Sequence, residues 1–150
     1  KCLSTSAVMV NRKILEDTPF FSEDEKFITA EDYHLWLKLA KHNVRFGFLD
    51  QILGKCRIHE GNNSGFPIKN MMAVKSVFTD YYDKIKNPSL KIKILAWRRL
   101  AIIEYSGARG LQRNREHFRA LITFIKAIAR WPFIPKFYLA FLFNIFHLKL

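Results

Sequence analysis

Apolar and polar residues follow two different periods along this chain of 150 residues. At 3–10, 44–48 and 52–58 the apolar residues alternate with polar ones or form short unbroken runs, which predicts three strands. The second and third of these stretches are separated by a polar turn, so we expect them to pair as a hairpin. The loop that follows, at 59–65, is rich in Gly and Asn.

Elsewhere the apolar residues recur three and four positions apart, which is the period of a helix that buries one side. The expected helices span 11–17, 29–40, 68–86, 89–105, 114–130 and 137–146, and the first of these is either a short helix or a turn. Gly107 and Gly110 are expected to end the fourth of these helices. The expected fold class is therefore α+β, with short strands and a hairpin in residues 1–66 and an all-helical region in residues 67–150.

The most amphipathic of these expected helices is the one at 114–130. Its apolar face would consist of Phe118, Leu121, Ile122, Ile125 and Ala129, and its other face of Arg115, Arg119, Lys126 and Arg130. The last apolar run, at 137–146, covers about ten residues, whereas a transmembrane helix needs about 20. We therefore expect this last helix to dock on the protein core or on a membrane surface.

The formal net charge is +12 at pH 7, and all of the excess lies in the C-terminal part of the chain. Residues 1–83 contain 11 basic and 11 acidic residues, whereas residues 84–150 contain 14 basic residues against Glu104 and Glu116. Such asymmetry indicates an anionic partner, either lipid headgroups or nucleic acid. Because no nucleic-acid reader motif is present and the apolar faces are rich in Phe, we expect an anionic membrane surface and no nucleic acid.

The two cysteines, Cys2 and Cys56, are too few for a zinc motif and form no CxxC pair. Free thiols in a reducing compartment are the expected state, and a disulfide requires that the two strands carrying them lie side by side. The chain begins with Lys1 and not with Met, and an expected strand starts almost at once, so we expect it to be part of a longer protein.

An adjacent pair of acids, Glu31 and Asp32, opens the expected helix at 29–40. Thr29, three residues before Asp32, fits a start that resembles a capping box. The free backbone N–H groups and the helix dipole favour ionised carboxylates in a first turn. A rigidly held, ionised carboxylate is what a general base needs, and acids are also ordinary residues in a first turn. The residues alone leave both interpretations open.

Two further groups of polar residues can carry chemistry. Arg57 and His59 lie on the same side of the second hairpin strand. Arg57 can hold a phosphate and His59 a metal ion or a phosphate, or both are surface residues at a strand end. The hydroxyl groups of Ser4, Thr5 and Ser6 can bind a sugar or a phosphate, or they simply begin a strand. GxSxG, HExxH, Walker and GxGxxG motifs are absent, so the corresponding classes gain no support.

The remaining candidates are given structural roles. His34 and His42 lie away from the start of the acid helix and are interpreted as surface or boundary histidines. Met71 and Met72 are interpreted as core residues and not as ligands.

Over about residues 3–64 these features resemble the C-terminal half of a family 2 glycosyltransferase, a group of inverting bacterial enzymes that build surface polysaccharides. The resemblance is carried by Ser-Thr-Ser-Ala-Val-Met-Val-Asn-Arg at 4–12, Ala-Glu-Asp-Tyr-His-Leu-Trp-Leu-Lys-Leu-Ala at 30–40 and Cys-Arg-Ile-His at 56–59. The chain departs from the family in two ways. Its nucleotide-binding half, with an Asp-x-Asp metal motif, is absent, and residues 18–21 read Thr-Pro-Phe-Phe where the family has Gly-Gly-Phe.

The resemblance implies the C-terminal part of a GT-A α/β fold and an assignment of catalytic roles. Asp32 would be the catalytic base that deprotonates the acceptor hydroxyl, which attacks the anomeric carbon of the sugar and displaces the nucleoside diphosphate. Glu31 would orient the acceptor or support the base. The strand with Ser4, Thr5 and Ser6 would line the acceptor side.

The same resemblance implies the partners. His59 would contact the metal ion or the diphosphate, and Arg57 would lie close by. The full-length enzyme would use a nucleotide-sugar donor, a glycan or lipid-linked acceptor and divalent Mn or Mg, none of which this part alone is expected to bind. The location would be cytoplasmic, peripheral on the inner face of the cell membrane. A homo-oligomer is possible.

A second hypothesis is non-enzymatic. The basic helical region from Lys84 onward would be a module that binds an anionic membrane or a partner protein, and the acid pair would be an ordinary cap.

Overall fold

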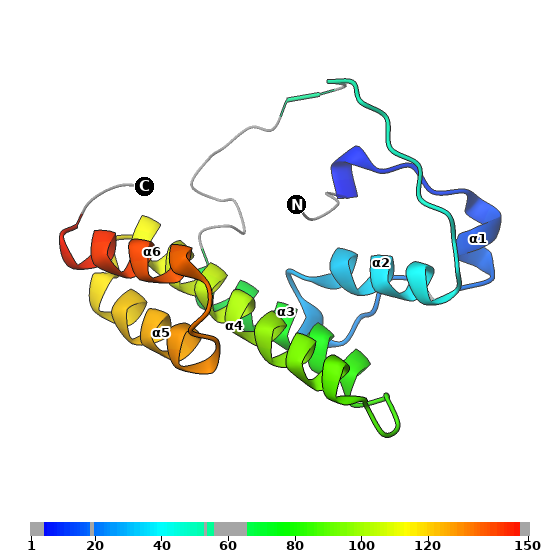
Figure 1. Ribbon diagram of the computed structural model, residues 1–150. Coiled ribbons are helices and arrows are strands. Elements are labelled where there is room, and N and C mark those ends of the chain that lie inside the picture. Colours follow the sequence, from blue (N-terminus) through cyan, green and yellow to red (C-terminus); the bar gives the residue numbers. More distant parts are fainter. Residues whose placement is uncertain (1–4, 19, 53, 56–65, 148–150) are drawn as a thin grey trace.

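The structure is a computed structural model that describes residues 5–18, 20–52, 54–55 and 66–147. Over these residues the chain contains helices and no strand (Figure 1). The elements are the 3-10 helices η1 (Thr5–Ala7) and η2 (Glu25–Phe27) and the α-helices α1 (Arg12–Glu16), α2 (Glu31–Lys41), α3 (Pro67–Tyr82), α4 (Leu90–Arg113), α5 (His117–Arg130) and α6 (Pro135–Ile145). The expected α+β class, with its GT-A strands and hairpin, is therefore wrong for the described residues.

The segment after α2 shows why the expected hairpin fails. Its alternating apolar residues face solvent, with Phe46 51%, Phe48 89% and Ile52 95% exposed. In Figure 1 this segment runs as a loop away from the helices. A strand needs a neighbour to satisfy its N–H and C=O groups and to cover its apolar side, and among the described residues this segment has none.

The first expected strand is replaced by a short helix and an extended stretch. Thr5–Ala7 forms η1, and the next residues continue without a strand partner in the described part of the chain. Val8 and Val10 pack against α2, where Leu35 and Leu39 are buried. The alternation at 8–10 therefore reports burial against a helix and not a place in a sheet.

Helix α2 is buried on two sides. Leu35, Trp36 and Leu39 face the N-terminal segment and α1, together with Val44. On its other side α2 meets η2 and α3 in a cluster made of Phe27, Ala30, Ala73 and Val77, against which Tyr33, Leu37, Val74 and Tyr81 pack. This cluster contains residues from both expected regions, 1–66 and 67–150, and therefore packs these two regions against each other.

Helix α4 continues through both glycines that were expected to end it. A Cβ atom at Gly107 would overlap the Met71 side chain, and one at Gly110 would overlap the ring of Pro67. The two glycines therefore let α3 approach α4 closely, and the expected end of the helix at 105 is wrong. Ser89 caps the start of α4 through its side chain, which accepts a hydrogen bond from the Ile92 amide.

Helices α4, α5 and α6 share one core. Two buried clusters join them, one around Leu111 and Phe124 and the other around Ala101 and Phe137. In Figure 1, α5 and α6 lie beside the C-terminal half of α4, at the end of the molecule away from α2. No helix in the described ranges combines the length and apolar character that crossing a bilayer requires.

Candidate functional site

The acid pair lies where the sequence places it, in the first turn of α2. The cap itself differs from the expected capping box, because the N-cap residue is Ala30 and no side chain caps the helix. Thr29 precedes it with a φ of 82°, a left-handed conformation that is strained for a β-branched residue. This turn directs the chain into α2.

Asp32 is held by two hydrogen bonds. The Tyr33 amide donates to its Oδ1 atom at 2.6 Å, and the Thr5 hydroxyl donates to its Oδ2 atom at 3.1 Å. The structure thus brings together two of the expected site residues that are 27 positions apart. Ser6 lies beside Thr5 in η1, and Ser4 lies outside the described residues.

Glu31 carries an oxygen that no partner satisfies. Its Oε2 atom is buried and accepts no hydrogen bond within the described part of the chain. Buried carboxylate oxygens are normally hydrogen-bonded, because burying an unsatisfied polar atom costs free energy. Among the described residues, Glu31 Oε2 is therefore an acceptor without a partner at the start of α2.

The first turn of α2 is also tied to α4. Arg99 donates a hydrogen bond from Nη2 to the Tyr33 hydroxyl at 3.1 Å, and its guanidinium lies 5.6 Å from the centre of the Tyr33 ring. A fixed first turn is a requirement for a carboxylate that must act in one geometry.

The remaining expected site residues cannot be placed. Arg57 and His59 both lie outside the described residues. Among the residues that are described, no three His, Cys, Asp or Glu side chains come together in a group that can hold a metal ion. The described residues therefore provide no set that fits the divalent metal of the family, and the metal role rests on the prediction for His59 alone.

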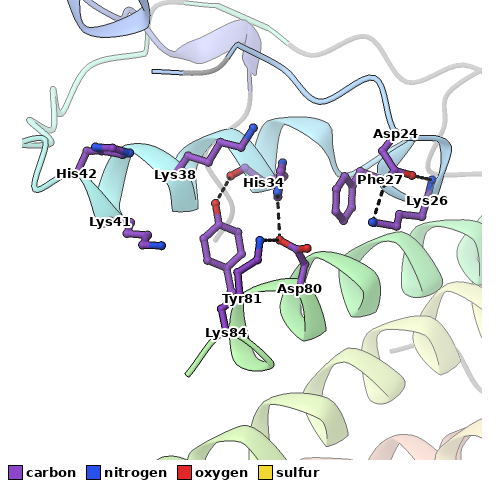
Figure 2. Close-up of a pocket in the computed structure, with 10 residues that line it drawn as sticks. All are labelled: Asp24, Lys26, Phe27, His34, Lys38, Lys41, His42, Asp80, Tyr81 and Lys84. Carbon is purple, nitrogen blue, oxygen red and sulfur yellow. Dashed lines mark hydrogen bonds and ion pairs between the residues drawn. The ribbon is translucent and has the colours of Figure 1, made fainter. Parts of the chain in front are cut away.

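A second polar region lies between α2 and α3, where ten residues line a cavity of about 390 Å³ (Figure 2). Four of them are lysines, and two of these are paired: Lys26 with Asp24 and Lys84 with Asp80, each at 2.7 Å. The lining residues are Asp24, Lys26, Phe27, His34, Lys38, Lys41, His42, Asp80, Tyr81 and Lys84. Lys26 holds the pKa of Asp24 below its ordinary range, and Lys84 does the same for Asp80, each through a hydrogen bond to the carboxylate.

His34 is buried in the wall of this cavity, which corrects its interpretation as a surface or boundary residue. Its side chain is stacked on Phe27, with ring centres 4.2 Å apart, and its Nε2 atom lies 3.7 Å from Asp80 Oδ2. The pKa of His34 is lowered, first because burial penalises the charged ring and second because Lys38 is nearby, while Asp80 opposes both effects. The lowered pKa favours the neutral form of His34.

Tyr81 and Asp80 were missed by the sequence reasoning. The Tyr81 hydroxyl donates to the backbone oxygen of His34 at 3.3 Å, and burial, with Asp80 nearby, raises the pKa of Tyr81 to about 12. The i,i+4 spacing of Asp80 and Lys84 was the available signal, because it predicts an ion pair on one helix face. It does not predict that this pair would lie next to a histidine from α2.

The acid pair and the cavity lie on different sides of α2. Neither Asp32 nor Glu31 lines the cavity, and neither does Thr5. Asp32 and His34 are two residues apart, about 200° around a helix, so their side chains leave α2 in nearly opposite directions. The two regions are therefore separate candidates, and only the first contains residues for which the resemblance implies a catalytic role.

Comparisons of this chain with protein-family models, with curated proteins and with solved structures found no match in any of the three. The interpretation of the site therefore depends on its own geometry and on the motif residues named above.

Proposed function

We propose that this chain is the acceptor-side part of an inverting glycosyltransferase that transfers a sugar from a nucleotide-sugar donor to a lipid-linked or polysaccharide acceptor in bacterial cell-surface glycan synthesis. One observation supports this most strongly. Asp32 is fixed in the first turn of α2 and accepts a hydrogen bond from an alcohol, the Thr5 hydroxyl, at 3.1 Å. The carboxylate is thus oriented to receive a hydrogen bond from a hydroxyl group, as a base acting on a sugar acceptor must be.

In the proposed reaction an acceptor hydroxyl takes the place of the Thr5 hydroxyl on Asp32. The carboxylate removes the proton while the acceptor oxygen forms a bond to the anomeric carbon. The bond from that carbon to the diphosphate oxygen breaks, and its electron pair leaves with the nucleoside diphosphate. Attack from the side opposite the leaving group inverts the configuration. Asp32 ends protonated and returns its proton to solvent.

Glu31 is proposed to orient the acceptor through its unsatisfied Oε2 atom, which can accept a hydrogen bond from a second sugar hydroxyl. Thr5 and Ser6 are proposed to line the same approach. The donor side, with Arg57 and His59 near the diphosphate and a divalent Mn or Mg ion, stays a prediction. Enzymes that use lipid-linked acceptors act at the inner face of the membrane, which is the proposed location.

The proposal is tested with the full-length enzyme, a panel of nucleotide sugars and lipid-linked acceptors. We expect one donor to release its nucleoside diphosphate only when acceptor is present, and the glycan product to have the inverted configuration. Release at the same rate without acceptor, or a product of retained configuration, would refute the acceptor-side assignment.

The second candidate function is a basic helical module that binds anionic membranes. It is favoured by the many large apolar side chains that α4, α5 and α6 expose to solvent. It does not exclude the first candidate, because a glycosyltransferase with a lipid-linked acceptor needs a way to reach the membrane.

A further inference from the structure

Helix α5 is apolar on the side that faces solvent. Phe118 is 75%, Ile122 40% and Ile125 51% exposed, and they follow one another at spacings of four and three residues. These spacings place the three side chains in one row along the helix. The row is the apolar face that the sequence predicts, but it contacts no core.

The core is reached by a different row of α5. Ala120, Phe124 and Ala127 are fully buried and belong to the clusters shared with α4 and α6. This buried row is displaced by two residues from Phe118, Ile122 and Ile125, or about 200° around the helix. The two apolar rows therefore lie on opposite sides of α5. The buried row combines two alanines with Phe124, and the exposed row of Phe118, Ile122 and Ile125 is left unpartnered within the described structure.

The neighbouring helix and the connection to it continue this pattern. Phe137, Ala140 and Asn144 are the buried residues of α6, and the remaining sides of this helix are almost entirely apolar. Phe133, in the connection between α5 and α6, is exposed. The large apolar residues exposed on α6 and at its C-cap are Tyr138, Leu139, Leu142, Ile145 and Phe146. So much exposed apolar and aromatic side chain on two packed helices indicates an interaction surface.

Basic residues flank the exposed row of α5. Arg119, Lys126 and Arg130 occupy one flank, between the exposed row and the core-facing row, and Arg115 lies in the turn just before the helix. Arg119 is paired with Glu116, and Arg130 with Glu104. Arg115 and Lys126 are exposed, and no carboxylate pairs with them among the described residues. From Asn114 to His147 the chain has five basic residues against Glu116, a balance of +4.

We propose that α5 and α6 dock on an anionic lipid bilayer, with α5 lying in the plane of the membrane surface. Phe118, Ile122 and Ile125 enter the boundary between headgroups and acyl chains, and Arg115 and Lys126 contact the lipid phosphates. An apolar row with a basic flank is the pattern of helices that lie in this interface. With 14 and 11 residues, the two helices are about 21 and 17 Å long, shorter than the hydrocarbon core of about 30 Å.

Charge favours lipid over a second copy of this chain. In a symmetric dimer formed through this surface, the same patch would meet itself, so the basic flanks would lie close to each other and repel. An anionic bilayer instead satisfies the basic flank and the apolar row together. This inference deepens the second candidate function and rests on it, and it is independent of the first candidate because lipid binding is measured without any sugar transfer.

The test is co-sedimentation of the 150-residue chain with vesicles of phosphatidylcholine alone and of phosphatidylcholine mixed with phosphatidylglycerol. We expect binding that requires phosphatidylglycerol. Phe118→Ser combined with Ile125→Ser should weaken the partition at least tenfold, because two large apolar side chains no longer enter the bilayer. The matched control is Phe48→Ser, an exposed apolar residue far from this surface that should leave the partition unchanged.

A second variant tests the charges. Arg115→Gln with Lys126→Gln should weaken binding to the anionic vesicles about thirtyfold, since each basic residue near such a surface contributes about 1 kcal/mol. The far-UV circular dichroism of this double variant should match that of the parent. Equal binding to neutral and anionic vesicles, or no binding to either, would overturn the proposal. So would an oligomer that Phe118→Ser/Ile125→Ser converts to a monomer, because the surface would then be a protein interface.

Discussion

The ion pair between Glu104 and Arg130 fixes how α5 lies on α4, and the structure predicts what happens when it is broken. Arg130 donates from Nε and from Nη2 to the two carboxylate oxygens of Glu104, each at 3.0 Å. The Glu104 side chain is 8% exposed and that of Arg130 30%. In Arg130→Met the Glu104 carboxylate therefore stays buried without its partner.

Breaking a buried pair in this way costs roughly 3–5 kcal/mol. Because solvent reaches the Arg130 guanidinium, we expect the lower end, about 3 kcal/mol. For a chain of this size that corresponds to a fall in Tm of roughly 6–12 °C. Urea unfolding followed by far-UV circular dichroism measures the loss directly, provided that the m-value is unchanged.

Two controls separate burial from charge. Arg119→Met breaks the exposed pair with Glu116 on the same helix and should cost less than about 1 kcal/mol. Combining Arg130→Met with Glu104→Met removes both charges and should recover most of the loss. If Arg130→Met costs no more than Arg119→Met, the reasoning about the buried pair is refuted.

Two further predictions concern packing and pH. Gly110→Ala should destabilise the fold by about 1–2 kcal/mol despite the better helix propensity of Ala, because its Cβ atom meets the rigid ring of Pro67. Gly107→Ala should cost less, because the neighbour of its Cβ atom is the flexible side chain of Met71. The urea midpoints of the two variants check this order. The pKa of His34 is lowered in the folded state, so its contribution to the free energy of unfolding is present above its ordinary pKa and is lost as the pH falls. His34→Phe should therefore flatten the decline of stability below neutral pH. An unchanged decline contradicts the assignment.

The helices were largely predictable from the sequence, and the strands were not. A helix satisfies its own hydrogen bonds, so the local period and residues such as Ser89 are enough to indicate it. The segment with Phe46 and Phe48 has the alternation of a strand, but a strand depends on a neighbour that may lie anywhere in the sequence. In the described residues that neighbour is missing, and the alternating side chains are exposed.

Packing between helices was also beyond the sequence pattern. The sequence pattern predicts the apolar row of α5 that contains Phe118 and Ile122, but it does not indicate what packs against this row. The core instead uses the row with Ala120 and Ala127, because small residues allow close approach to α4. The sequence also does not show the role of Gly110. A glycine can end a helix or let a neighbouring helix approach closely, and only the contact with Pro67 distinguishes the two.

For the candidate site, the sequence indicated the acid pair and the hydroxyl segment but not their contact. The hydrogen bond between Thr5 and Asp32 spans 27 positions and depends on how the N-terminal segment packs against α2. The burial of His34 could not be predicted either, because it depends on α3 placing Asp80 and Tyr81 beside it.

The central claim is that Asp32 is the base that removes the proton of the acceptor. Single-turnover transfer by the full-length enzyme at saturating donor, with Asp32→Asn beside the exposed control variant Asp50→Asn, tests it most directly. We predict that Asp32→Asn binds the nucleotide sugar as the parent does and transfers at least about 100-fold more slowly, whereas Asp50→Asn transfers at the parent rate. Transfer by Asp32→Asn at the parent rate would contradict the account.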